Sequence, residues 1–170
     1  MLKEHRDAFS WSYKEMKGVH PSLCTHHIYI KEGCKPVWKP QRRMNLALKY
    51  VVKEELQMLL DAWLIYPISE REWISPLVLV PKKIFKWRIC VDYRKLNKAT
   101  KKNHFPLPFI DHVLDGLAGK TFFSFLDGFN GYNQIQISTK DRDKTTFTCP
   151  WGDFAYRVLP FGLCNAPATF

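Results

Sequence analysis

The sequence has no apolar run long enough to cross a bilayer, for which about 18 residues are needed. Its opening residues, MLKEHRD, are charged where a secretory signal peptide would be apolar. Both absences argue against membrane insertion and secretion. We therefore expect a soluble intracellular protein, cytoplasmic or nuclear, with no membrane partner.

Cysteine is scarce and scattered, with five residues and no Cys-x-x-Cys spacing. An odd number of dispersed cysteines is typical of reduced thiols inside a cell rather than of a disulfide framework. One group in the first quarter of the chain could be imagined as a zinc site, but its spacing fits no standard pattern, so we do not expect zinc there. The group is Cys24, His26, His27 and Cys34.

Acidic residues are few relative to basic ones, since 16 Asp and Glu oppose 26 Lys and Arg, for a net charge of +10. This excess favours a polyanionic partner such as nucleic acid, with a merely basic surface as the alternative. No repeat, low-complexity segment or linker divides the 170 residues, of which 46% are hydrophobic. Length and composition predict one globular domain with a real core, and the helix-like and strand-like segments along the chain make it an α+β unit.

Helical periodicity is strongest over residues 44–64, which we expect to form an amphipathic packing helix without a chemical role. A second core helix is expected within 105–119, with Asp111 and Asp115 on its solvated side; a pair of cooperating acids is the alternative. A short helix is also expected over 5–16. A last helix should begin at Asn165.

Strand-like segments make up much of the rest. Residues 74–81 and 87–93 should form a β-hairpin with a basic turn. On the second strand Arg88 and Asp92 share a face, so the carboxylate could hold the arginine for phosphate binding. A polar connector is expected over 95–104. The other expected strands are 25–31, 121–126, 133–137, 145–149 and 154–159, the last two joined as a hairpin.

The apolar run 121–126 ends at Asp127 and Gly128. A carboxylate at the mouth of a buried strand, followed by small residues, could hold a metal ion. Asp-Gly between two strands is also a good hairpin turn. The residues alone leave both interpretations open.

Several long motifs occur in a characteristic order: SPLVLVPKK, KWRICVDYRKLNKAT, HFPLPFIDHVLDGLAG, FFSFLDGFNGYNQIQI and KTTFTCPWGDFAYRVLPFGLCNAPATF. Together they resemble the reverse transcriptase (RNA-directed DNA polymerase) of gypsy-type LTR retrotransposons, plant elements in particular. The resemblance implies, over 41–170, the fingers and the first part of the palm of a right-hand polymerase, with an antiparallel sheet and packing helices. Residues 1–40 resemble the connector between protease and polymerase in such Pol polyproteins.

The resemblance implies template-directed DNA synthesis from dNTPs, with two Mg²⁺ (or Mn²⁺) ions as cofactors. It also implies an RNA or DNA template–primer as the partner and virus-like particles as the location. Asp127 matches the first catalytic, metal-binding aspartate. Lys83 and Arg88 match residues that hold the triphosphate, and Tyr132 matches the aromatic gate that excludes a ribose 2′-hydroxyl. The remaining matches to nucleotide-binding positions are Asn130 and Gly131, whose backbone N–H groups would face the triphosphate, and Phe161 and Gly162, which would line the pocket.

The sequence departs from the family pattern in two places. Ile84 and Phe85 stand where relatives carry Asp-Gly at the hairpin tip, and the Tyr-x-Asp-Asp motif with its two further aspartates is not among the 170 residues. We therefore expect a fragment truncated before that motif, separated from the rest of the Pol polyprotein and inactive by itself. The alternative is a non-catalytic, basic nucleic-acid-binding remnant of a decayed element.

Overall fold

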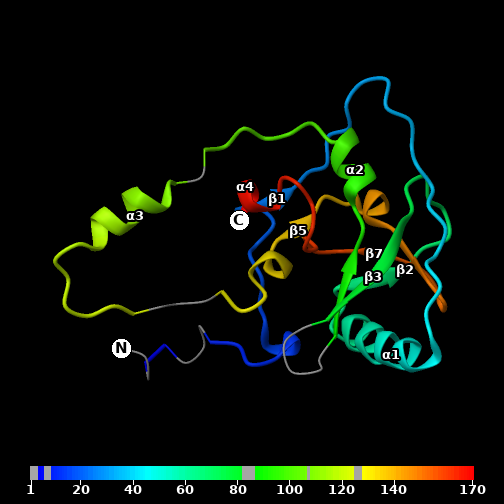
Figure 1. Ribbon diagram of the computed structural model, residues 1–170, viewed down its shortest axis with the longest axis horizontal. Helices are drawn as coiled ribbons and strands as arrows, with labels where there is room; N and C mark the ends of the chain where they lie inside the picture. The colour runs from blue at the N-terminus through cyan, green and yellow to red at the C-terminus, as the bar shows by residue number, and fades with distance from the viewer. Residues whose placement is uncertain (1–3, 6–8, 82–86, 107, 125–127) are drawn as a thin grey trace.

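The computed structural model is an α+β fold, as predicted, in which helix α1 packs on a five-stranded sheet and helix α3 stands away from the body (Figure 1). None of the helices in the described part of the chain is long and apolar enough to span a membrane. The structure describes residues 4–5, 9–81, 87–106, 108–124 and 128–170.

The sheet has the strand order β2-β7-β6-β3-β4. The neighbours β3 and β6 are parallel, and the other pairs are antiparallel. Both predicted hairpins are therefore confirmed, β3 with β4 and β6 with β7. The strands are β2 (Ile65–Pro67), β3 (Ser75–Pro81), β4 (Trp87–Val91), β6 (Phe147–Cys149) and β7 (Gly152–Tyr156).

A second sheet pairs β1 (Thr25–His26) with β5 (Gln136–Ile137) in parallel. The predicted strand over 133–137 was largely wrong, because a 3-10 helix, η3 (Gly131–Gln134), occupies its first half. Asn130 adopts a left-handed conformation with φ 45° and turns the chain into η3. Local hydrogen bonds of the 3-10 helix therefore replace the expected strand, and strand pairing begins only at Gln136.

Helix α1 (Leu46–Asp61) confirms the strongest periodic signal. The Asn45 side chain caps it by accepting a hydrogen bond from the Leu48 N–H at 2.8 Å, and its apolar side is buried on the sheet. The helix stops short of Trp63, which lies within the predicted helical span 44–64 but is exposed, in a left-handed conformation with φ 58°.

Three shorter helical segments differ from prediction to different degrees. Helix α2 (Arg94–Ala99) was missed, because a short basic stretch with only two buried side chains carries little periodicity. Helix α4 (Ala166–Thr169) begins after Asn165 with a proline in its first turn, as predicted. The expected helix over 5–16 is reduced to the 3-10 turn η2 (Tyr13–Glu15) in the part that is described, and another 3-10 turn, η4 (Arg142–Thr145), precedes β6.

Helix α3 (Ile110–Leu117) was expected in the core, and this was wrong: none of its residues is buried. Residues 121–124 form no strand, and Phe122 is 92% exposed. The prediction of a buried strand over 121–126 therefore fails for its described part, where no described strand pairs with it. An apolar run becomes a strand only where a neighbour accepts its backbone hydrogen bonds.

The core lies between α1 and the sheet and continues to β5 and α2. Phe147 on β6 is fully buried between the rings of Phe154 and Tyr156, at centroid distances of 6.0 and 5.4 Å. The Tyr93 hydroxyl donates a hydrogen bond to the Thr145 carbonyl oxygen at 2.8 Å. Ile28, from the segment predicted as a connector, is buried in the same core.

Candidate functional site

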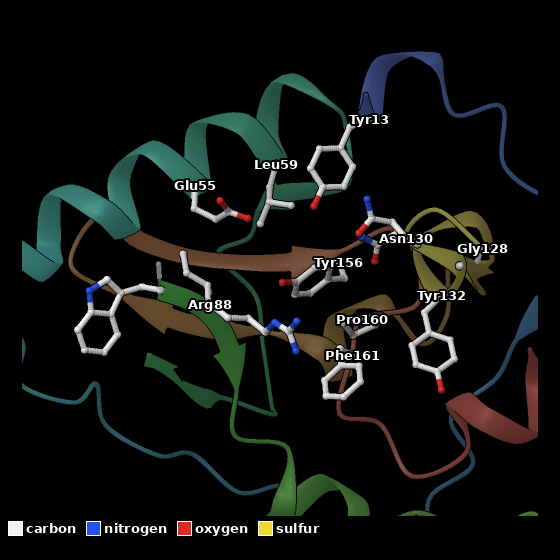
Figure 2. A pocket seen from close by; sticks show the side chains of 14 residues that line it. Tyr13, Glu55, Leu59, Arg88, Gly128, Asn130, Tyr132, Tyr156, Pro160 and Phe161 are labelled. Carbon is white, nitrogen blue, oxygen red and sulfur yellow. The ribbon is translucent and has the colours of Figure 1, made fainter. Parts of the chain in front are cut away.

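A cavity of about 690 Å³ opens between α1, β4, η3 and the segment that follows β7. Figure 2 shows Arg88 reaching across it from β4, Glu55 and Leu59 on α1 above, and Asn130, Tyr132 and Phe161 on the side of η3. Residues far apart in the sequence thus meet around one space. Five of the predicted nucleotide-binding residues line this cavity, namely Arg88, Asn130, Gly131, Tyr132 and Phe161.

The other predicted site residues are placed differently. Asp127 and Lys83 lie outside the described residues, as do Ile84 and Phe85 of the hairpin tip. Gly128, which directly follows Asp127 in the chain, lines the cavity. Gly162 does not line it; its carbonyl oxygen accepts a hydrogen bond from the Asn97 amide at 2.7 Å.

The loop that carries Asn130 and Gly131 is held by its own backbone. The Gly131 N–H donates to the Gly128 carbonyl oxygen at 3.1 Å, and the Asn133 N–H donates to that of Asn130 at 2.8 Å. A phosphate bound by the Gly131 N–H would therefore have to displace an existing hydrogen bond. The Gln134 amide closes the loop by donating to the Phe129 carbonyl oxygen at 2.9 Å.

Three aromatic rings form one wall beside this loop. Tyr132 lies 6.1 Å from Phe161 and 5.5 Å from Phe170, measured between ring centroids. A side chain on Gly131 would place its Cβ atom 2.6 Å from Cζ of Phe170, which is too close for any carbon contact. Glycine at position 131 is what lets the Phe170 ring approach the loop.

Three polar groups that line the cavity were missed by sequence reasoning: Tyr13 on η2, Glu55 on α1 and Tyr156 on β7. Burial raises the pKa of the Tyr13 and Tyr156 hydroxyls, and the nearby Glu55 raises both further. Glu55 is half-buried next to the apolar face of α1. The position of Glu55 at the edge of the apolar stripe of α1 could have indicated a functional role. Tyr13 lies in a segment without periodicity, so no sequence signal pointed to it.

The possible pairing of Arg88 with Asp92 is not found, because Asp92 pairs with other cations. Asp92 is buried, and Arg94 donates to its two oxygens from Nε and Nη2, each at 2.7 Å. These hydrogen bonds hold the pKa of Asp92 well below its ordinary range. Because β4 ends at Val91, strand alternation does not extend to Asp92, which faces α2 and the extended basic segment instead. Two cations of that segment complete its surroundings, Arg42 at 3.2 Å and Lys39 at 3.6 Å.

The sequence profile described as "Reverse transcriptase (RNA-dependent DNA polymerase)" matches residues 80–170. The chain is 37% identical over 155 residues to the "Retrovirus-related Pol polyprotein from transposon 412" of Drosophila melanogaster, covering 88% of this chain and 12% of that polyprotein. It is 49% identical over 83 residues to the "RNA-directed DNA polymerase homolog" of Oenothera berteroana, covering 49% of this chain and 58% of the homolog. The chain thus spans a small part of the polyproteins that it matches.

Solved structures with a similar fold include the prototype foamy virus protease-reverse transcriptase, with a TM-score of 0.76 and 25% identity over 86% of this chain and 19% of that one. A foamy viral protease-reverse transcriptase in complex with double-stranded DNA has a TM-score of 0.67 and 25% identity, covering 86% of this chain and 25% of that one.

Proposed function

Because the chain belongs to the reverse transcriptase (RNA-dependent DNA polymerase) family and corresponds to part of a retrotransposon Pol polyprotein, we propose that its cavity binds the incoming deoxynucleotide during template-directed DNA synthesis. We further propose a gypsy-type element as its source. The observation that carries the first proposal is the meeting of Arg88, Tyr132 and Phe161, from three separate segments, around one cavity.

The chemistry of these side chains supports the proposal. The Arg88 guanidinium can bind two phosphate oxygens at once, and its charge is permanent. Tyr132, packed near Phe161, offers an aromatic surface beside which a deoxyribose would fit and a 2′-hydroxyl would collide. Asn130 and Gly131 would bring the loop backbone close to the triphosphate.

Divalent metal ions belong to the proposed reaction, and the described residues do not supply a site for them. No group of three His, Cys, Asp or Glu side chains is gathered in the described ranges. The carboxylate on the cavity wall is Glu55, across the cavity from the η3 loop (Figure 2). The proposed metal ligand Asp127 lies outside those ranges.

The net charge of +10 supports a nucleic-acid partner, which we propose to be an RNA or DNA template–primer. The foamy viral protein was solved with double-stranded DNA. A non-catalytic protein that binds nucleic acid through charge alone remains the second candidate. A protein of this second kind would bind nucleic acid with a steep salt dependence, and its cavity would have no affinity for dNTP.

Replacing Arg88 with alanine should weaken dNTP binding by about tenfold to a hundredfold, because a charge-assisted hydrogen bond contributes about 1.5–3 kcal/mol. Isothermal titration with dTTP and Mg²⁺ measures the effect, and Arg88→Lys should recover part of it. Lys98→Ala is the matched control, since Lys98 is an exposed cation on α2 that does not line the cavity. Equal affinities for Arg88→Ala and the wild type would refute the pocket assignment.

The 170-residue chain alone is expected to show no primer extension. Two divalent metals need several carboxylate oxygens, and the chain carries Asp127 but no Tyr-x-Asp-Asp motif. The measurement is incorporation of labelled dNTP on a primed template. Incorporation by the purified chain that Asp127→Ala abolishes would contradict this expectation.

A further inference from the structure

Outside the cavity, three side chains form a compact stack at the edge of the sheet. The guanidinium carbon of Arg157 lies 4.6 Å from the ring centroid of Tyr66 and 5.5 Å from that of Trp63. Both distances are within the range of cation–π interactions. Tyr66 belongs to β2, Trp63 to the turn before it, and Arg157 follows β7. We call these residues the Trp63 stack.

The Trp63 stack and the cavity lie on opposite faces of the sheet. Ile65 pairs with Tyr156, and Tyr156 lines the cavity. The chain continues extended through Arg157, whose N–H donates to the Leu64 carbonyl oxygen at 2.9 Å. Because side chains alternate along a strand, Tyr66 and Arg157 point away from the cavity. The Trp63 stack is therefore a separate surface.

Packing does not account for a tryptophan at this position. Trp63 has φ 58°, a left-handed conformation that disfavours any side chain with a Cβ atom and that glycine adopts freely. Its side chain nevertheless remains 73% exposed, so little burial offsets the strain. A strained, exposed aromatic residue is a reason to look for a binding role. One ring face meets Arg157, and a ring this exposed still offers area to a ligand.

The surroundings of the Trp63 stack are mainly cationic. Burial raises the pKa of Tyr66, while Arg142 and Arg157 lower it and Asp143 raises it, so two arginines and one aspartate lie around the ring. Nε of Arg157 is buried and has no hydrogen-bond partner among the described residues. A flat aromatic ring next to arginines suits a ligand that combines a planar base with a phosphate.

We propose that the Trp63 stack binds an unpaired nucleotide of single-stranded nucleic acid, with the base stacked on Trp63 and the phosphate near Arg157. This inference rests on the proposed nucleic-acid binding and adds a site on the face opposite the nucleotide cavity. DNA and RNA share the required chemistry, because every base has a flat face and every linkage carries a phosphate.

The test measures fluorescence anisotropy of short fluorescein-labelled oligothymidylate and oligouridylate with the full 170-residue chain. Trp63→Gly should weaken binding by about tenfold, since stacking of one base on an aromatic ring contributes appreciably to affinity. Glycine keeps the left-handed turn, and Trp63→Asn provides a second non-aromatic variant that tolerates it. Trp63→Phe should retain most of the affinity. The comparison of the two oligonucleotides shows whether DNA or RNA is preferred.

Two controls separate stacking from charge and from folding. Trp11→Ala removes another exposed tryptophan, 85% exposed and remote from Arg157 in sequence, and should not change the affinity. Blunt duplex DNA, whose bases are already stacked, should bind Trp63→Gly and the wild type equally. Wild-type affinity in Trp63→Gly and Trp63→Asn, an equal loss for duplex DNA, or no measurable binding by the wild type would each overturn the inference.

The same proteins distinguish this inference from the proposed nucleotide pocket. Trp63→Gly should bind dTTP as the wild type does, and Arg88→Ala should bind oligothymidylate with at least most of the wild-type affinity. Failure of the wild type to bind dTTP, with oligonucleotide binding still dependent on Trp63, would count against the pocket alone.

Discussion

Phe147→Ala is expected to lower the free energy of unfolding by about 3–5 kcal/mol, because the truncation of a buried aromatic side chain leaves a cavity. Phe147 has no exposed area, and it contacts the rings of Phe154 and Tyr156. Its strand, β6, joins β7 to β3. Since domains are stable by only about 5–15 kcal/mol, this single change should remove much of the stability.

The matched control is the same substitution at Phe122, which is 92% exposed. Phe122→Ala should change the free energy of unfolding by less than about 0.5 kcal/mol. Urea denaturation followed by circular dichroism measures both variants under identical conditions. Similar losses in the two variants would mean that residues 121–124 are packed in solution, against the arrangement in Figure 1.

Acidification should destabilise the fold through His26. Its Nδ1 lies 2.8 Å from the Thr169 hydroxyl oxygen, and that hydroxyl donates to the Asn165 carbonyl oxygen, so His26 supplies the proton of the pair. Burial lowers the pKa of His26 from 6.5 to about 4; the nearby Asp141 opposes this shift, and His27 adds to it. The folded protein therefore keeps the imidazole neutral where the unfolded chain protonates it.

The pH dependence follows from this difference in proton uptake. Because the unfolded chain binds a proton near pH 6.5 and the folded chain only near pH 4, the contribution is fully present above pH 6.5 and is lost as the pH falls to about 4. Its total is about 3 kcal/mol, at 1.36 kcal/mol per pKa unit. Urea denaturation at a series of pH values between these limits measures the slope.

His26→Gln should remove most of this slope, because glutamine can donate to Thr169 and does not titrate. His112→Gln is the control, since His112 lies on α3, where no residue is buried. The control should retain the wild-type slope. A slope unchanged by His26→Gln would show that other groups cause the acid sensitivity.

Local signals in the sequence were sufficient for several elements. The hairpins β3–β4 and β6–β7 follow from strand segments separated by short turns, and α1 follows from a long apolar stripe. Motif order was sufficient to group Arg88, Tyr132 and Phe161, which line one cavity, although their roles remain predictions. The hairpins and the helix depend on residues close together in the chain, and the grouping of the site residues depends on the order of complete motifs.

Contacts between segments that are distant in the chain could not be predicted from the sequence. Asp92 pairs with Arg94 and with Arg42 rather than with Arg88, because the end of β4 and the path of the basic segment decide which cation it meets. Glu55 reaches the cavity because α1 crosses the sheet there (Figure 2).

The same reasoning explains the largest errors. Helix α3 and residues 121–124 do carry the apolar residues on which the prediction of burial was based, yet these residues are exposed. Hydrophobicity indicates what a segment would bury, whereas burial also needs a partner surface, and only the assembled fold decides whether one is present. Composition and motif order thus identify the family and the local elements, and tertiary packing decides which side chains meet.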